Sequence, residues 1–416
     1  MKRIALTLLL FVVICQAKGQ MQQAIENIRQ EYNLMGLSVA AVCDGKLAGT
    51  WHAGLRDYDR NLPVNDSTKY RVASISKLVL TTAMMKLCEE KLLNLDHDAS
   101  NYLGFTLRNP HYPEKPVTVR MLLLHTSSIN EGSGYDSFLT DTYNNVSDPP
   151  PISELLVPGG RYCTDNMWRN EPPGEYYSYC NANFGLAGTV IENITGQRFE
   201  DYMQETLLKP LGITGSYIPE GIHDINNLAV IYEAEDGQWK AQADDFNGVM
   251  SAPRDFSGYV TGTNAAVFSP QGGLRISAAE LARIMILHLS KGKYEGERII
   301  SGKSIKLMHT PEWVFDGTNG DVTGGRKESR GPGVHILPVA EESDALAPGV
   351  RMMGHSGSAY GLISLFYFDP EGIYGFIFMT NGIFNGPRKV KSSLFYNCED
   401  AVVKALRENN YLPCDL

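Results

Sequence analysis

Two strongly apolar segments near the C-terminus constrain the fold more than any other part of the chain. Residues 362–368 read Leu-Ile-Ser-Leu-Phe-Tyr-Phe, residues 374–380 read Tyr-Gly-Phe-Ile-Phe-Met-Thr, and Asp-Pro-Glu-Gly lies between them. Short apolar runs around such a turn predict a β-hairpin, and strands without alternating polar residues are buried on both faces. The sequence therefore predicts a central, buried pair of strands.

Further strand signals lie at the opposite end of the chain. Residues 38–42 favour a strand, Asp44-Gly45 is a hairpin turn signal, and residues 47–51 favour a returning strand. A helical run from residue 388 to residue 407 closes the chain. Strands at both ends indicate one antiparallel sheet that is assembled from the N- and C-terminal parts.

Helical patterns dominate the middle of the chain. Helices are predicted for residues 78–90, 184–194 and 199–208, and Ser277 begins another with a capping box. Residues 127–173 are rich in Gly, Asn, Asp and Pro and are expected to form loops.

We therefore predict an α/β (α+β) fold, with an antiparallel sheet flanked by helices and a mainly helical region inserted. The sheet part covers about residues 20–73 and 215–416, and the helical part about residues 74–214. Together they form a single domain over residues 20–416, preceded by a signal peptide over residues 1–19.

The signal peptide is predicted from its three parts. Lys2 and Arg3 give a positive start, residues 4–15 are apolar, and residues 17–19 form a small-x-small cleavage site. The apolar run is shorter than the roughly 20 residues that span a bilayer. Lipoprotein processing would use Cys15, but the residue before it is bulky where that processing prefers a small one. We expect a soluble protein that is exported to the periplasm or the exterior.

Composition excludes several classes of partner and cofactor. The formal net charge is −10 and no run of Lys and Arg occurs, so nucleic acids and anionic membranes are poor partners. No C-x-x-C or H-E-x-x-H motif occurs, so no metal or other cofactor is expected. Export permits disulfides, but six cysteines allow 15 pairings, and buried free thiols are equally compatible with the sequence. These cysteines are Cys43, Cys88, Cys163, Cys180, Cys398 and Cys414.

The first candidate for chemistry is Ser74-Ile75-Ser76-Lys77, directly before a predicted helix. Positions three apart share nearly one helix face, so the Lys77 amine can help remove the Ser74 proton. The N–H groups of the first turn also favour negative charge at the hydroxyl. A second Ser-x-x-Lys copy at residues 290–293 follows an apolar helical run and indicates only a helix end.

The second candidate cluster contains Tyr179 and Asn181. Tyr179 and Asn181 precede a predicted helix, and a Tyr179 phenol becomes a useful base only where a cation such as Lys77 depresses its pKa. The alternative role for Tyr179 is an aromatic packing anchor.

The third cluster is His355-Ser356-Gly357-Ser358, at the start of a predicted strand. Gly357 allows a substrate backbone to approach, and the Ser358 N–H is placed to donate to an oxyanion. A lone histidine is more often structural than catalytic. The neighbouring residues fail the last position of a G-x-S-x-G elbow and precede a strand, which disfavours a Ser-His-Asp hydrolase.

Together these clusters resemble the serine β-lactamase and penicillin-binding-protein superfamily, in particular its class C β-lactamase-like branch of DD-carboxypeptidases, D-amino-acid peptidases and carboxylesterases. The family motifs S-x-x-K, Y-x-N and H-x-G correspond to Ser74/Lys77, Tyr179/Asn181 and His355/Ser356/Gly357. The resemblance extends over about residues 22–407. Further matching motifs are Leu123-Leu124-His125-Thr126-Ser127, Pro173-Gly174, Pro210-Leu211-Gly212 and Gly272-Gly273-Leu274.

The resemblance implies an acyl-enzyme mechanism on an amide or ester. Ser74 would attack the carbonyl, Lys77 and Tyr179 would share the proton transfers, and Asn181 would position the substrate amide. The N–H groups of Ser74 and Ser358 would hold the oxyanion. The remaining two implied site residues, which would line the site and help to bind a substrate carboxylate, are His355 and Ser356.

Three departures from the family pattern narrow the activity. His355 stands where class C β-lactamases have lysine, which favours the peptidase and esterase branches over efficient β-lactam hydrolysis. Because an ordinary histidine titrates near pH 6.5, activity is expected to change near the titration of His355. Ser128 replaces a glycine and Cys180 replaces a serine, and a disulfide at Cys180 would stiffen the site. The leading expectation is a peptidase for peptides that contain D-amino acids. The alternatives are a carboxylesterase, a β-lactamase, or a binding protein without turnover.

Overall fold

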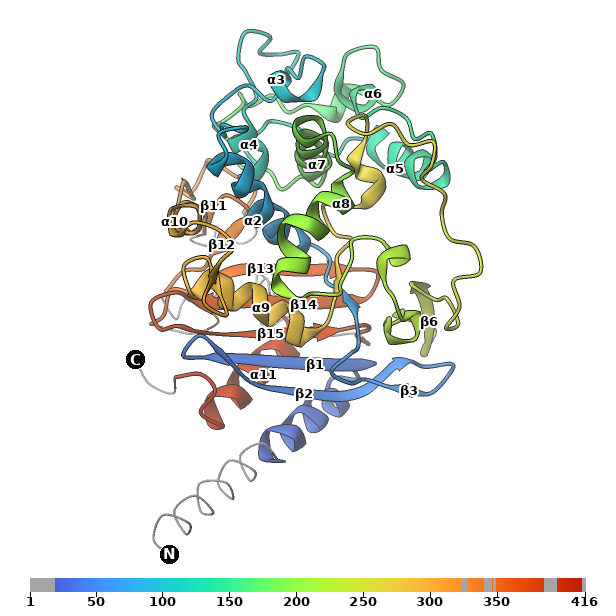
Figure 1. Ribbon diagram of the computed structural model, residues 1–416, viewed down its shortest axis with the longest axis vertical. Coiled ribbons are helices and arrows are strands. Elements are labelled where there is room, and N and C mark those ends of the chain that lie inside the picture. The colour runs from blue at the N-terminus through green and yellow to red at the C-terminus, as the bar shows by residue number, and fades with distance from the viewer. Residues whose placement is uncertain (1–18, 323–327, 340–345, 347–348, 385–394, 414–416) are drawn as a thin grey trace, which may run out of the picture.

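The computed structural model describes residues 19–322, 328–339, 346, 349–384 and 395–413. Its centre is an antiparallel sheet of nine described strands, in the order β10-β11-β12-β13-β14-β15-β1-β2-β3, with helices on both faces (Figure 1). The predicted α/β (α+β) architecture is confirmed.

The predicted C-terminal hairpin lies in the interior of this sheet. It consists of β14 (Leu362–Asp369) and β15 (Tyr374–Thr380), and every residue of both strands is buried. On its other side, β15 pairs with β1 (Gly36–Cys43), which in turn pairs with β2 (Lys46–Asp57). The two ends of the chain therefore share one sheet, as predicted.

The alternation along β1 divides the core into two layers. Val39 and Ala41 belong to the apolar cluster on one face, whereas Ala40 and Val42 belong to the larger cluster on the other face. Successive side chains of a strand point to opposite faces, so a strand buried on both sides needs apolar residues at every position. This explains why β1, β14 and β15 lack a polar face.

Different helices cover the two faces (Figure 1). The terminal helices, residues 19–31 and α11 (Asn397–Glu408), pack on the face of Val39. Helix α9 (Ala278–Leu289) and the inserted helical region cover the opposite face. The helix predicted for residues 388–407 was placed too early, because residues 395–396 precede α11; residues 388–394 of that prediction lie outside the described residues.

The inserted region contains the predicted helices with shifted boundaries. Helix α2 spans Ile75–Glu89, α7 spans Ala182–Thr195, and α8 (Phe199–Met203) continues as a π-helical turn, Gln204–Leu208. The expected loop region also contains helix α5, Gly134–Asn144, so that prediction was wrong there. The other helices are α3 (Ser100–Leu103), α4 (Val119–Leu123), α6 (Ser153–Leu156) and α10 (Gly302–His309), and short 3-10 turns lie at Asp165–Met167, Lys209–Leu211, Pro219–Gly221, Ile225–Asn227 and Ala265–Phe268. The other strands are β3 (Leu62–Pro63), β4 (Tyr70–Arg71), β5 (Ile231–Glu235), β6 (Gln238–Ala243), β7 (Arg275–Ile276), β8 (Lys293–Tyr294), β9 (Glu297–Arg298), β10 (Trp313–Val314), β11 (Ser329–Gly331), β12 (Val334–Ile336) and β13 (Met353–Ala359).

Helix α9 confirms two local predictions. The Ser277 side chain accepts the Glu280 N–H, and the Glu280 carboxylate accepts the Ser277 N–H, which completes the capping box. At the other end Ser290 is the C-cap, so the second Ser-x-x-Lys copy marks a helix end.

The described cysteines are free thiols, namely Cys43, Cys88, Cys163, Cys180 and Cys398, whereas Cys414 lies outside the described residues. The disulfide considered for Cys180 is therefore not formed with any described cysteine. Among the described helices, none has both the length and the hydrophobicity needed to cross a bilayer. The predicted signal peptide falls almost entirely on residues that the structure does not describe.

Candidate active site

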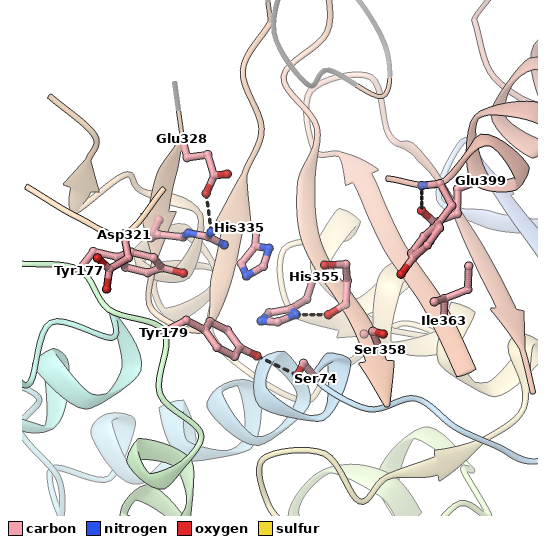
Figure 2. A pocket seen from close by; sticks show the side chains of 14 residues that line it. Ser74, Tyr177, Tyr179, Asp321, Glu328, His335, His355, Ser358, Ile363 and Glu399 are labelled. Carbon is pink, nitrogen blue, oxygen red and sulfur yellow. Dashed lines mark hydrogen bonds and ion pairs between the residues drawn. The ribbon is translucent and has the colours of Figure 1, made fainter. Parts of the chain in front are cut away.

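Ser74 stands at the junction between a short strand and a long buried helix. Strand β4 leads into it, and Ala73, the residue before it, has a φ of 45°, a left-handed conformation that non-glycine residues rarely adopt. Ser74 is then the N-cap of α2, and Lys77 lies one turn into that helix. The sharp change of direction at Ala73 presents the hydroxyl in a cavity, toward Tyr179 (Figure 2).

Lys77 is the most deeply enclosed charged group of this region, with 0% of its surface exposed. Its Nζ donates to Ser74 Oγ at 2.9 Å, to Asn181 Oδ1 at 2.7 Å and to the Gln271 carbonyl at 2.8 Å. All three acceptors are neutral, so they do not compensate fully for the loss of water around the ammonium group. Burial lowers the pKa of Lys77 to about 7, which makes a neutral amine available near physiological pH.

Tyr179 approaches the same oxygen from the other side. Its hydroxyl donates to Ser74 Oγ at 2.7 Å, and Lys77 Nζ lies 4.9 Å from its ring centroid. Although 38% of Tyr179 is exposed at the cavity, the protein around its hydroxyl raises the pKa above the ordinary value. The expectation that Lys77 depresses this pKa is therefore wrong, and Tyr179 is a neutral hydrogen-bond donor.

His125, from the Leu-Leu-x-His-Thr-Ser motif, positions the segment that carries Tyr179. Its ring stacks on the Tyr179 ring with centroids 4.3 Å apart, and its Nδ1 accepts the Cys180 N–H at 3.0 Å. His125 itself has a φ of 58°. The motif thus packs against the Tyr179 loop and holds it in place, and it does not supply a reacting group.

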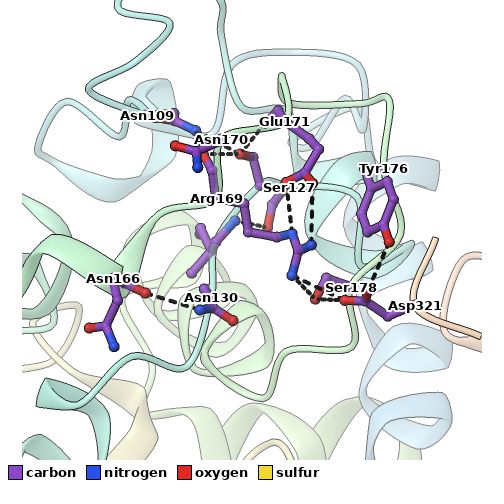
Figure 3. A network of polar contacts seen from close by, with 12 residues as sticks. Asn109, Ser127, Asn130, Asn166, Arg169, Asn170, Glu171, Tyr176, Ser178 and Asp321 are labelled. Carbon is purple, nitrogen blue, oxygen red and sulfur yellow. Dashed lines mark hydrogen bonds and ion pairs between the residues drawn. The ribbon is translucent and has the colours of Figure 1, made fainter. Parts of the chain in front are cut away.

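A network of polar contacts joins the loops that carry Arg169, Ser178 and Asp321 (Figure 3). Arg169 Nη1 donates to Asp321 at 3.0 Å and to Ser178 Oγ at 3.2 Å, and the Tyr176 hydroxyl donates to the same aspartate at 2.8 Å. Ser128, which replaces the family's glycine, keeps a left-handed φ of 67° and donates from its hydroxyl to the Glu171 carbonyl at 2.6 Å. That hydrogen bond helps to offset the backbone strain of a non-glycine residue at this position.

Asn181 is the N-cap of α7 and contacts Lys77 directly. Its Oδ1 accepts from Lys77 Nζ, so this half of the amide is engaged before any substrate arrives. Its backbone N–H donates to the carboxylate of Glu131, a residue that no motif in the sequence singled out. The proximity of Glu131 to the His125 motif was the only sequence signal that pointed to it.

The His-x-Gly cluster lies on β13, an inner strand between β12 and β14. His355 is buried, its Nδ1 lies 2.6 Å from the Ser356 carbonyl, and its ring centroid is 3.9 Å from that of His335. Burial, reinforced by the charge of Lys77, holds the pKa of His355 well below its ordinary value. The expectation that His355 titrates near neutral pH is therefore wrong, and its imidazole is uncharged at that pH.

Gly357 is needed for a reason that the sequence did not reveal. A Cβ at this position would lie 2.3 Å from the Val72 carbonyl oxygen and 3.2 Å from Ala73 Cβ. The chain that leads into Ser74 therefore lies directly against β13, in the place that was assigned to a substrate backbone. As a result of this contact, Ser74 and Ser358 line the same cavity.

That cavity has a volume of about 340 Å³. It brings together Ser74, Tyr179 and the predicted residues of β13 (Figure 2). Lys77 and Asn181 are not part of the lining; Lys77 donates to Ser74 and to Asn181. Its lining comes from segments far apart in the sequence. The lining residues are Ser74, Tyr177, Tyr179, Asp321, Glu328, Arg330, His335, His355, Ser356, Gly357, Ser358, Ile363, Tyr396 and Glu399.

Arg330 of β11 is the residue in this lining that sequence reasoning missed and that matters most. Only 7% of it is exposed, and its Nη2 donates to Glu328 at 2.5 Å. Its Nε and Nη1 have no hydrogen-bond partner among the described residues, and neither does Nε2 of the adjacent His335. Buried donors without partners are costly, and the guanidinium of Arg330 also brings a positive charge to this lining.

No group of three or more His, Cys, Asp or Glu side chains in the described part of the chain is arranged to hold a metal ion. The described residues of the site supply a serine hydroxyl, a buried amine and a phenol beside a polar cavity, which are groups suited to nucleophilic and acid–base chemistry.

Comparisons with known proteins agree with this arrangement. Protein flp of Staphylococcus aureus (strain N315) is 27% identical over 231 residues, which are 56% of this chain and 44% of that protein, so the chain spans less than half of its length. Penicillin-binding protein 4 of Amycolatopsis lactamdurans is 26% identical over 294 residues, which cover 69% of this chain and 68% of that protein.

Solved structures share the fold. The octameric penicillin-binding protein homologue of Pyrococcus abyssi has a TM-score of 0.67 at 25% identity, over 94% of this chain and 76% of that chain. The hydrolase EstCE1 has a TM-score of 0.67 at 19% identity, over 95% and 99%. D-alanine carboxypeptidase AmpC of Burkholderia cenocepacia has a TM-score of 0.62 at 18% identity, over 95% and 98%.

The family model described as Beta-lactamase matches residues 21–393, which is most of the chain. The resemblance inferred from the motifs is thereby confirmed over nearly the span predicted for it. The chain therefore belongs to the Beta-lactamase family.

Proposed function

We propose that this protein hydrolyses peptides that end in a D-amino acid with a free carboxylate, through an acyl-enzyme on Ser74. The observation that carries the substrate class is the buried Arg330, whose Nε and Nη1 lack partners among the described residues in the cavity that Ser74 also lines. A guanidinium binds a carboxylate through paired, charge-assisted hydrogen bonds. His355 is neutral, so the anchor lies on β11 and not on the His-x-Gly motif.

The first chemical step is the activation of Ser74. Its Oγ accepts from both Lys77 and Tyr179, at 2.9 and 2.7 Å. Once Lys77 is neutral, the Ser74 hydroxyl turns its proton toward the amine, while Tyr179 continues to donate to the oxygen. Oγ then attacks the substrate carbonyl, and the proton passes by way of Lys77 and Tyr179 to the leaving amine.

The negative charge of the tetrahedral intermediate needs preorganised donors. The backbone N–H groups of Ser74 and Ser358, on opposite sides of the contact made by Gly357, fill this role in the proposal. Asn181, held by Lys77, positions the substrate amide, and Ser356 lies beside the carboxylate. Water then hydrolyses the Ser74 ester, and the amine of Lys77 accepts its proton.

A carboxylesterase is the second candidate, and one observation favours it. The neutral His355 removes the fixed positive charge that a lysine would supply, so esters without a carboxylate meet no unfavourable group there. The fold of the hydrolase EstCE1 also matches this chain over nearly its whole length. If the protein is a carboxylesterase, Arg330 has a structural role and does not bind the substrate.

We also propose that residues 1–19 direct export and are removed, that residues 20–416 form one catalytic domain, and that its partner is a small-molecule or peptide substrate. These proposals rest on the charged and apolar pattern of the N-terminus and on the length of the family match. Mass spectrometry of secreted protein should place the mature N-terminus at residue 20.

Covalent labelling tests the acyl-enzyme directly. A fluorophosphonate or a labelled β-lactam should modify Ser74 in the wild-type protein and leave the Ser74→Ala variant unlabelled. Hydrolysis of a peptide ending in D-Ala-D-Ala, of a p-nitrophenyl ester and of nitrocefin then separates peptidase, esterase and β-lactamase activity. A protein that takes no label and binds ligand equally well as Ser74→Ala would refute the enzyme mechanism.

A further inference from the structure

Behind the nucleophile, a carboxylate, an amide and an amine form a continuous chain of hydrogen bonds. Glu131, on the loop between α4 and α5, accepts the backbone N–H of Asn181 through Oε1, and its Oε2 lies 3.4 Å from Asn181 Nδ2. On the other side of the same amide, Asn181 Oδ1 accepts from Lys77 Nζ at 2.7 Å. The side chain of Asn181 therefore links Glu131 to Lys77.

This arrangement selects one orientation of the Asn181 amide. An amide has an acceptor oxygen and a donor NH₂, and only the acceptor can face the ammonium group of Lys77. The carboxylate of Glu131, which accepts and does not donate, favours the NH₂ on its own side. Without Glu131 the amide could turn and present a donor to Lys77, which would displace Nζ from Ser74.

We propose that Glu131 is a positioning residue for Lys77: it fixes the Asn181 amide toward the amine, and its negative charge stabilises the protonated amine. The catalytic meaning of this role rests on the proposed function, because it assumes that Lys77 exchanges protons with Ser74. Burial lowers the pKa of Lys77 to about 7, and the charge of the Glu131 carboxylate opposes that effect.

The other titratable groups that act on Lys77 do not supply a negative charge. Burial raises the pKa of Tyr179 and of Cys180, so both are neutral near pH 7, and it lowers the pKa of His125 and His355, which are neutral as well. The further groups are cationic Arg330 and neutral His335. Burial raises the pKa of Glu131 as well, against the hydrogen bonds from Asn181 and the charge of Lys77, which favour its carboxylate form. Of these groups, Glu131 is the one whose carboxylate charge stabilises the ammonium form of Lys77.

The test is a direct titration of the Lys77 amine. Lysine labelled with ¹³C at Cε reports its protonation by NMR, and the Lys77→Ala variant assigns the signal. Glu131→Gln removes the charge but retains an acceptor for the Asn181 N–H, so it should lower the Lys77 midpoint by on the order of 0.5 to 1 pH unit. Glu131→Ala is the second charge-removing variant and should give the same direction.

Two controls separate charge from structure. Glu131→Asp keeps the charge and should keep the midpoint near the wild-type value, and Glu114→Gln removes one exposed charge elsewhere and should leave it unchanged. In active enzyme, the acidic limb of the kcat/KM profile should move to lower pH in Glu131→Gln by the same amount as the NMR midpoint.

A residue that merely caps α7 would behave differently: Tm would fall in Glu131→Gln while the Lys77 midpoint stayed fixed, and that result overturns the proposal. The titration needs no turnover, so it decides the role of Glu131 even if Ser74 takes no acyl group. Failure of the proposed function would instead appear as unlabelled Ser74 with the Lys77 shift intact.

Discussion

The proposed binding of the substrate carboxylate by Arg330 predicts how much kcat/KM falls when this side chain is replaced. A carboxylate bound by Nε and Nη1 of this buried guanidinium, which lack partners among the described residues, gains hydrogen bonds to a charged group, each worth about 1.5–3 kcal/mol. Because each 1.36 kcal/mol is tenfold in rate, the loss of even one such bond lowers kcat/KM by about 10- to 150-fold. The loss should appear for a peptide with a free C-terminal carboxylate and not for the same peptide with a C-terminal amide.

The perturbation must account for Glu328, which accepts from Arg330 at 2.5 Å. Arg330→Met alone would take away the cation beside a buried carboxylate, and breaking a buried pair in this way costs about 3–5 kcal/mol of stability. The informative variant is therefore Arg330→Met combined with Glu328→Gln, compared with Glu328→Gln alone. Both should be checked for a cooperative thermal transition before kinetics.

The assay is the hydrolysis of matched acid and amide peptides, with release of the C-terminal residue followed by chromatography. We expect the double variant to lose discrimination between the two peptides, mostly through KM, while fluorophosphonate labelling of Ser74 proceeds at the wild-type rate. Equal losses on acid and amide, or no loss on either, would refute the assignment of Arg330 as the carboxylate anchor and would favour the esterase.

Four further outcomes follow from the structure. Because the amine of Lys77 must be neutral to accept a proton and its pKa is about 7, kcat/KM should fall about tenfold per pH unit below pH 7, and stopped-flow acylation rates check this. His355 stays neutral, so His355→Asn should leave the midpoint of that limb in place; a midpoint that moves with this variant would contradict the burial argument. Gly357→Ala places a Cβ 2.3 Å from the Val72 carbonyl, so calorimetry should show a loss of about 1–3 kcal/mol of stability, and Ser74 labelling should slow as well; wild-type values for both would contradict the close contact. Since the described cysteines, Cys180 included, are free, dithiothreitol should leave Tm unchanged, and a drop in Tm would reveal a disulfide.

The features of this protein that depend on local pattern could be predicted from its sequence. Continuous apolar runs predicted the buried hairpin, because a strand covered on both faces has no room for polar residues. The spacing of Ser74 and Lys77 on one turn of a helix predicted their contact, because helix geometry brings positions three apart together. The motifs before α7 and on β13 contribute residues to the cavity that Ser74 lines.

Other features were decided only by the tertiary structure, because they depend on what surrounds each group. The depressed pKa of Lys77, the raised pKa of Tyr179 and the neutral state of His355 follow from burial, which no short motif encodes. Arg330 and Glu131 belong to no motif and reach the site through the pairing of β11 with β12 and through a contact across 50 residues. Gly357 was identified from the sequence, but its partner, the backbone that leads into Ser74, became visible only once the chain had folded.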